Sequence, residues 1–299
     1  MRAWSVLFIG LSAVALTAKP INGQQMAFPP EFEQGMEQMF QRFMGDSDAE
    51  RQRLEQVEVS PREEQRVGRE RLAQFRRDLA QRDIHLVERG KEVDYLQSLI
   101  NRIRPRLKNA NRYRIIEVYL VETTATDAGS LPGGFIVVSR GLLDFCQSEA
   151  ALVGVLSHEL SHLDRGHQLE LVRRMKLFQQ SMQGRPAGPQ SFFADGMVMA
   201  KGFARPFRPD QEVEADADAT RWTYELNYDP LQMAELFDRL HERDQARDAL
   251  RMPTMFRSHP YHQDRSRAIR QQTADLQRAS PKRDLIVGRE ELRQLLRER

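Results

Sequence analysis

The residues best suited to chemistry in this sequence are His158, Glu159 and His162, which lie close together in the stretch 157–162. Histidines four positions apart stand one above the other on a helix, so both imidazoles can be aimed at one metal ion. The carboxylate of Glu159 would lie next to that face, where it could accept a proton from a water molecule held by the ion. Two incidental histidines on a packed helix are the alternative interpretation.

The pattern His-Glu-x-x-His at 158–162 is typical of a zinc-binding helix in metallopeptidases. Catalytic zinc needs a third protein ligand and keeps its fourth position open to water. A candidate follows Pro209, where Glu212 and Asp216 are four residues apart and share one face of a predicted helix. Glu212 could bind zinc while Asp216 accepts a hydrogen bond from a ligating histidine. Spacing alone leaves Glu214 open as an alternative third ligand.

The helix that carries the motif is predicted to begin at Ser148, a good N-cap, and to end at Gly166. Leucines at positions 152, 156, 160 and 163 fall on one side of it, and the two histidines fall on another. His167 lies five residues after His162, about 140° around a helix. We therefore expect His167 to be a helix-end histidine that points away from the metal, not a ligand.

Other helices are predicted from their caps and their apolar spacing. One runs from 60 to about 88, and a second runs from about 91 to 104. Further helices are expected after Pro209 and after Pro230. A charged helix at 289–297 carries leucines on one side, which could dock on the domain or bind a partner.

Two strands are predicted, at 113–122 and 135–139, from their β-branched and aromatic content. A polar linker at 123–130 and the turn Leu131-Pro132-Gly133-Gly134 lie between them. The fold class is therefore α+β and mostly helical, with a small antiparallel sheet beside the motif helix. The edge of that sheet could bind an extended peptide.

Composition indicates a soluble globular protein, with 40% hydrophobic and 29% charged residues among 299. This length allows two domains, or one catalytic domain with extensions. A net charge of +2 gives no indication of a nucleic-acid partner. The single cysteine, Cys146, cannot form a disulfide within the chain, and we expect it to be buried and unreactive.

The first residues are typical of a secretory signal, because Arg2 precedes an apolar run at 4–18. That run is shorter than the ~20 residues that a membrane span needs. We expect export, to the bacterial periplasm, with an uncleaved membrane anchor at 4–18 as the alternative. A Met- and Gln-rich amphipathic extension at 24–59 could be a tail on the domain or a contact surface for a partner. Segment 169–209 could be packed core with a surface loop, or a lid.

Five motifs are distributed over about 60–275 at characteristic spacing. They are Leu131 to Val138, Gly141-Leu142-Leu143, Leu156 to His162 with His167, Glu212-x-x-Ala215-Asp216, and His259-Pro260 with Arg265. Together they resemble the gluzincin metallopeptidases of the HtpX, BepA and CAAX-prenyl-protease type, metallopeptidase family forty-eight. The chain is most similar to the exported, soluble BepA-like branch.

The resemblance implies that Glu212 is the zinc ligand, because the first Glu of the family's Glu-x-x-Ala-Asp motif has that role. It implies that His259 lies beside the zinc, where it can stabilise the oxyanion or cap the metal. Arg265 would then help to hold the His259 loop. One departure concerns the stretch 127–130, where this chain has Asp-Ala-Gly-Ser and the family usually has Asn-Ala-Phe-Ala. That departure removes bulk close to the cleft.

The site residues predicted from the sequence are the metal ligands His158, His162 and Glu212, the catalytic residues Glu159 and His259, and the supporting residues Asp216 and Arg265. They predict a zinc-dependent endopeptidase with one zinc ion. The catalytic domain is expected at 60–275, after a signal or anchor at 1–23 and the extension at 24–59, and before a C-terminal helix within 276–299.

Its substrates would be unfolded or misassembled proteins, in a quality-control role, and the oligomeric state is open. Membrane contact is possible through an uncleaved N-terminal segment. A chaperone or assembly factor for exported proteins, with restrained proteolysis, is the alternative from another class. A hydrolase that acts on other bonds is a third interpretation.

Overall fold

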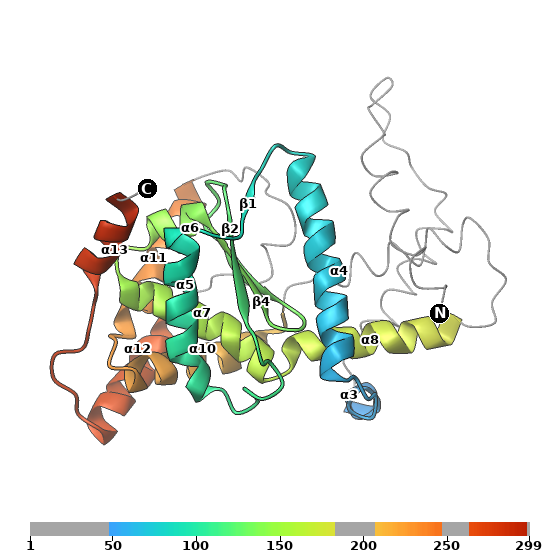
Figure 1. Cartoon of the computed structure of the whole chain (residues 1–299). Coiled ribbons are helices and arrows are strands. Elements are labelled where there is room, and N and C mark those ends of the chain that lie inside the picture. Colours follow the sequence, from blue (N-terminus) through green and yellow to red (C-terminus); the bar gives the residue numbers. More distant parts are fainter. Residues whose placement is uncertain (1–47, 183–206, 247–262, 298–299) are drawn as a thin grey trace. The chain divides into compact units, whose positions relative to one another are not determined.

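The computed structural model describes residues 48–182, 207–246 and 263–297, and Figure 1 draws the remaining residues as a thin trace. The chain divides into two compact units. One comprises Ser60–Leu169 with Pro206–Arg299, and the other comprises Met1–Val59 with Glu170–Arg205. Within the described ranges, no helix combines the length and apolar character needed to cross a membrane. The expected signal or anchor, His259 and most of the 169–209 segment lie outside those ranges.

Helices make up most of the larger unit. They are α4 (Pro61–Ala80), α5 (Lys91–Ile103), η1 (Arg104–Arg106), α6 (Arg140–Phe145), α7 (Glu149–Asp164), α10 (Pro209–Glu225), α11 (Leu231–Ala246), α12 (Gln263–Ala279) and α13 (Arg289–Arg297). The motif helix α7 begins as predicted, because the Ser148 hydroxyl accepts a hydrogen bond from the Ala151 amide at 3.2 Å. It ends as predicted at Gly166, whose φ of 77° is easily adopted by glycine.

Helix α4 ends earlier than the sequence predicts. It stops at Ala80, and the chain then turns through Asp83, which has a φ of 56°. Strand β1 (Leu86–Val87) follows and pairs with the strand at 117–121. The expected continuation to about 88 is therefore wrong, because its apolar residues pair in the sheet rather than extending the apolar face of the helix.

The sheet has four strands in the order β1-β2-β4-β3 and is mixed, not wholly antiparallel. Strand β2 (Glu117–Val121) pairs in parallel with β4 (Phe135–Ser139), while β1 and β3 (Ala128–Leu131) each pair antiparallel. The expected linker at 123–130 contains the start of β3. Because β3 and β4 form the hairpin around Gly133 and Gly134, β4 returns to lie parallel to β2.

Helix α7 lies at the centre of the larger unit, and all 16 of its residues are buried, not only one face. It packs on α10, α11, α5 and β3. Leu152, Leu156 and Leu160 are fully buried, and each stabilises the fold by about 1.5–3 kcal/mol relative to exposure. Gly154 permits close packing, since a Cβ there would stand 2.8 Å from Cβ of Met233 on α11. The motif is thus carried by the most enclosed helix of the unit.

Glu64 fixes the position of the β3–β4 hairpin relative to α7. Its buried carboxylate accepts hydrogen bonds from Arg112 Nε at 2.6 Å and from the Gly133 amide at 3.0 Å. The Tyr113 hydroxyl lies 2.9 Å from the same carboxylate and 3.1 Å from the carbonyl oxygen of Leu163, near the end of α7. Burial and the Glu64 carboxylate raise the pKa of Tyr113, so this hydroxyl remains a donor.

The charged helix α13 docks on its own domain. Leu292 is 1% exposed and belongs to the main core, with Leu295 and Leu296 packed against it. Helix α8 (His167–Met182) enters the smaller unit at Glu170. In that unit, the chain after α3 (Asp48–Glu55) accepts hydrogen bonds from α8 at its carbonyl groups. Arg173 Nε binds the carbonyl of Val57 at 3.1 Å, and Lys176 Nζ binds that of Glu58 at 2.7 Å.

Candidate metal centre

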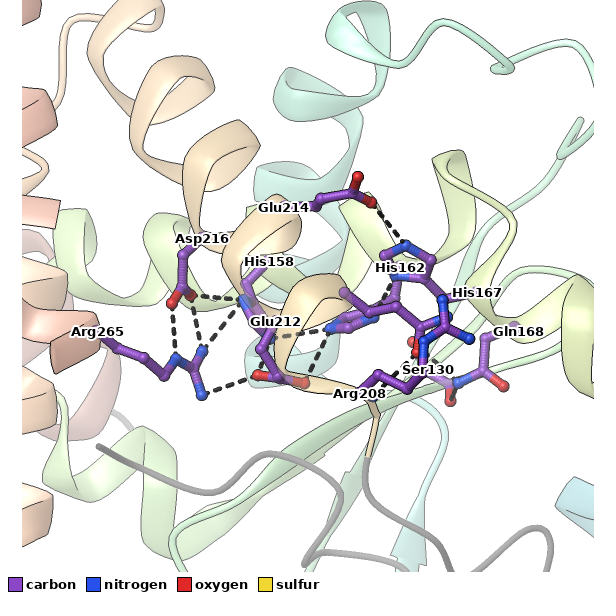
Figure 2. A network of polar contacts seen from close by, with 11 residues as sticks. Ser130, His158, His162, His167, Gln168, Arg208, Glu212, Glu214, Asp216 and Arg265 are labelled. Atoms are coloured by element: carbon purple, nitrogen blue, oxygen red, sulfur yellow. Dashed lines mark hydrogen bonds and ion pairs between the residues drawn. The ribbon is translucent and has the colours of Figure 1, made fainter. Parts of the chain in front are cut away.

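The candidate metal centre lies where α7 meets α10 (Figure 2). Asp218 of α10 ties the two helices together, because its carboxylate accepts hydrogen bonds from Ser161 Oγ at 2.9 Å and from Arg165 Nε at 2.5 Å. Pro209 in the first turn starts α10, and the Gln211 side chain accepts a hydrogen bond from the Arg208 amide at 3.1 Å. The helix start places Glu212 against α7.

His158 and His162 of α7 and Glu212 of α10 converge and are all buried. The two Nε2 atoms are 3.1 Å apart, and Glu212 oxygens lie 3.5 Å from Nε2 of each histidine. Tetrahedral zinc with bonds of about 2.0–2.1 Å separates its ligand atoms by about 3.3–3.4 Å. The three observed separations therefore fit one zinc ion. Among the described residues, no other group of three His, Cys, Asp or Glu side chains meets the same geometric test.

The charges of the site also fit a divalent ion. Three carboxylates, of Glu159, Glu212 and Asp216, are each at least 96% buried, and the buried cation Arg265 lies beside the last two of them. Buried carboxylates are costly unless positive charge compensates them. A divalent ion together with Arg265 would balance the three negative charges.

Asp216 orients His158. Its Oδ1 lies 2.9 Å from Nδ1 of His158, so this ring nitrogen carries the hydrogen and Nε2 is left as the metal-binding atom. Burial by itself would raise the pKa of Asp216, but Arg265 and His158 outweigh burial and lower the pKa to about 2. The aspartate is therefore an anion at neutral pH, in the supporting position that its spacing from Glu212 predicts.

Arg265 of α12 contacts the carboxylates of Glu212 and Asp216 on α10. Its Nε and Nη2 lie 2.6 and 2.7 Å from the two oxygens of Asp216, and its Nη1 lies 2.8 Å from Glu212 Oε2. The guanidinium also stands over the ring of Phe237, 4.7 Å from its centre. Its expected contact with the His259 loop falls outside the described residues. The sequence offered no sign that Arg265 would reach Glu212 itself.

Glu159 is 2% exposed and follows His158 on α7. Glu214, the alternative third ligand, is separated from the group: its carboxylate is half-exposed and pairs with Arg165 at 3.2 Å and with His167 at 3.3 Å. The preference for Glu212 thus agrees with the geometry.

His167 does not point away from the centre as expected. Its Nδ1 lies 2.8 Å from Nδ1 of His162. The angle of about 140° assumed an unbroken helix, but α7 ends at Asp164 and Gly166 turns the chain, so His167 starts α8 beside His162. A histidine directly after a helix-ending glycine was the signal available in the sequence.

Two histidines and a glutamate on adjoining helices, beside a small sheet, are an arrangement that could hold the ion of a zinc metallopeptidase. In agreement, residues 91–273 match the model of Peptidase family M48, which covers more than half of the chain. The chain belongs to this family, as the sequence motifs indicated. Peptidases of the family use zinc, and the cluster fits that ion.

Two curated proteins are similar to the chain at low identity. It is 28% identical over 183 residues to the beta-barrel assembly-enhancing protease of Yersinia pestis, an alignment that covers 56% of this chain and 36% of that protein. It is 27% identical over 159 residues to the mitochondrial metalloendopeptidase OMA1 of Schizosaccharomyces pombe, which covers 51% of this chain and 45% of that protein. The matched region thus spans less than half of either relative.

Proposed function

We propose that this chain is a zinc-dependent endopeptidase, with its catalytic domain at 60–275. The observation that carries the proposal is the buried cluster of His158, His162 and Glu212, whose ligand atoms lie 3.1–3.5 Å apart. Membership of a metallopeptidase family supports it independently. The assignment of the single residues to metal binding and catalysis is part of the proposal.

In the proposed mechanism, His158 Nε2, His162 Nε2 and a Glu212 oxygen would hold the ion. Bound zinc would polarise the scissile carbonyl and lower the pKa of the attacking water. Glu159 accepts a proton from that water as its oxygen adds to the carbonyl carbon, and then donates the proton to the amine nitrogen as the C–N bond breaks. Asp216 keeps His158 in the tautomer that presents Nε2. His259 is the candidate for stabilising the oxyanion.

We propose that the substrate binds as an extended peptide along β3. This strand ends the sheet order, and it packs on α7. Ser139 donates its amide hydrogen to the carbonyl of Asp127, which therefore points toward β4. Because successive carbonyl groups of a strand point to opposite sides, those of Ala128 and Ser130 point away from β4. Among the described residues, nothing lies within 4 Å of where a Cβ on Gly129 would stand. The position where the family usually has Phe therefore leaves open space beside β3.

The proposed setting is protein quality control in an exported compartment, the bacterial periplasm. The signal-like residues 1–23 support export, and the name of the Yersinia pestis relative, beta-barrel assembly-enhancing protease, supports a role in protein assembly. An uncleaved segment at 4–18 would instead anchor the enzyme to the membrane. These assignments rest on sequence features outside the described residues and on similarity.

Digestion of casein by the full chain, with and without a zinc chelator such as 1,10-phenanthroline, tests the proposed activity. We expect cleavage that the chelator abolishes and that added zinc restores. Cleavage that is insensitive to chelation would refute the proposal. The chaperone alternative predicts that Glu159→Gln still rescues an aggregating client protein as well as wild type does. The peptidase proposal predicts that cells producing that client are protected by wild type but not by the variant.

A further inference from the structure

The ring of His162 is held on the side opposite its metal-binding nitrogen. Nδ1 of His162 faces Nδ1 of His167 at 2.8 Å, and the two rings meet edge to face with their centres 4.9 Å apart (Figure 2). Both residues are buried, at 0% and 7% exposure. Neither the metal ligands nor the proposed mechanism accounts for this second histidine.

The tautomers of the two rings follow from the metal geometry. His162 presents Nε2 to His158 and Glu212, so in a neutral ring the hydrogen must be on Nδ1. His162 Nδ1 is then the donor, and His167 Nδ1 must accept. The hydrogen of His167 is consequently on Nε2, which lies 3.3 Å from Oε2 of Glu214.

Glu214, at the outer end of this series of hydrogen bonds, is held by an ion pair. Oε2 of Glu214 also lies 3.2 Å from Nη1 of Arg165, the C-cap residue of α7. Arg165 in turn is bonded to Asp218. Glu214 is therefore kept as an acceptor for His167 Nε2–H, so His162 donates to His167 and His167 donates to Glu214.

Phe207 restrains the same ring from its face. It stacks on His162 with ring centres 3.9 Å apart and an angle of 19° between the planes. With His167 at its edge and Phe207 on its face, the His162 ring has little freedom to rotate about its side-chain bonds.

His167 cannot be a further ligand to the same ion as His162. The nitrogen that it turns toward His162 meets Nδ1, whereas the ion would be bound at Nε2 on the other side of the ring. Its other nitrogen is directed to Glu214.

We propose that His167 is a positioning residue of the metal centre: by accepting the Nδ1 hydrogen of His162 it fixes that ligand's tautomer and ring orientation, with Glu214 holding His167 in turn. The inference rests on the proposed zinc site. The two ligating histidines would then differ in the group that orients them, which is a carboxylate for His158 and a neutral imidazole for His162.

Two substitutions of similar polarity separate this role from mere packing. In His167→Asn the amide oxygen can occupy the place of Nδ1 and still accept from His162, but the contact with Glu214 is lost. In His167→Gln the longer side chain reaches the place of Nε2 and Glu214 instead. The matched control is His85→Gln, at an exposed histidine before β1.

The experiment measures the zinc affinity of the metal-free full chain by competition with a chromophoric chelator. We expect His167→Gln to bind zinc about 10–100-fold more weakly than wild type, the usual cost of losing a partner of a metal-ligating histidine. His167→Asn should stay within about threefold of wild type, because the acceptor is retained. The control should match wild type. Glu214→Gln, at a half-exposed site, should weaken binding by less than His167→Gln does.

Cobalt substitution gives a second readout, because the visible bands of bound Co²⁺ report ligand geometry. The bands of His167→Asn should match those of wild type, and those of His167→Gln should shift. Equal affinities and spectra for the Asn and Gln variants, or the reverse order, would overturn the role of His167 while leaving the zinc site intact. Failure of wild type itself to bind zinc would overturn the proposed function as well.

Discussion

Oδ1 of Asp216 lies 2.9 Å from Nδ1 of His158. Asp216 follows Glu212 by one helical turn, and the Glu212 carboxylate faces Nε2 of the same ring. Two pairs of residues with a spacing of four, one on α7 and one on α10, thus meet at one place. The first pair offers two nitrogens, and the second offers a ligand oxygen and an orienting carboxylate. Among the described residues, the site is built by this packing of the two helices.

Replacing Glu212 with Gln should remove zinc from the protein. The amide is neutral and a weaker ligand than the carboxylate, so zinc affinity should fall by at least about 100-fold. Glu214→Gln, on the same helix, is the comparison variant and should weaken zinc binding far less than Glu212→Gln does. Equilibrium dialysis followed by metal analysis measures both. A full complement of zinc in the Glu212 variant would move the third ligand elsewhere.

Replacing Arg265 with Met should destabilise the metal-free protein strongly. Two buried carboxylates, of Glu212 and Asp216, would lose their shared cation, and breaking such a buried pair costs about 3–5 kcal/mol. Zinc should recover part of this loss, because it supplies positive charge at the same place. Thermal unfolding with and without zinc measures the effect. Equal melting temperatures for wild type and variant without metal would contradict it.

The Cys146 thiol should be inert in the folded protein and should reduce stability at high pH. Burial raises its pKa to about 12. The folded state therefore keeps a proton that the unfolded state loses above about pH 8.5. Its contribution to stability is intact below that pH and should fall by about 1.4 kcal/mol per pH unit up to about pH 12. The control is Cys146→Ala, which should lack this slope in denaturant titrations. Rapid reaction of native protein with a thiol reagent would refute the burial argument.

Gln168 should compete with the substrate for strand β3. Its side-chain amide donates a hydrogen bond to the carbonyl of Ser130 at 2.6 Å, a group that points away from β4. A peptide that pairs with β3 would have to displace it, which opposes binding by about 0.5–1.5 kcal/mol. In Gln168→Ala we expect KM for an extended peptide to fall by about two- to tenfold, with kcat little changed. A higher KM would show that Gln168 shapes the site instead.

The sequence was sufficient for the parts that depend on local pattern. The spacing of His158 and His162, the cap at Ser148 and the start of α10 at Pro209 are all properties of neighbouring residues, and the structure confirms the elements that they predicted. Spacing favoured Glu212 over Glu214 only weakly, and the family resemblance strengthened that preference. The structure agrees with that preference, because Glu214 turns outward to Arg165.

The predictions that failed for the strands depend on contacts distant in the sequence, whereas the one for His167 failed at a local turn. Leu86 and Val87 read as the end of a helix, but pairing with Val121 and Leu120 makes them a strand. The small residues of β3 have weak strand propensity, and their hairpin partner decides their conformation. His167 was misplaced because a single glycine redirects the chain. None of these contacts leaves a periodic signal.

The proposed mechanism is tested by the effect of Glu159→Gln on peptide cleavage, measured on protein whose zinc content is determined in the same sample. The variant keeps the shape of the side chain but cannot accept the proton. We predict one zinc ion per chain in both proteins, with cleavage by the variant reduced by about 10²–10⁴. Cleavage at the wild-type rate by zinc-loaded Glu159→Gln would contradict the proposed mechanism.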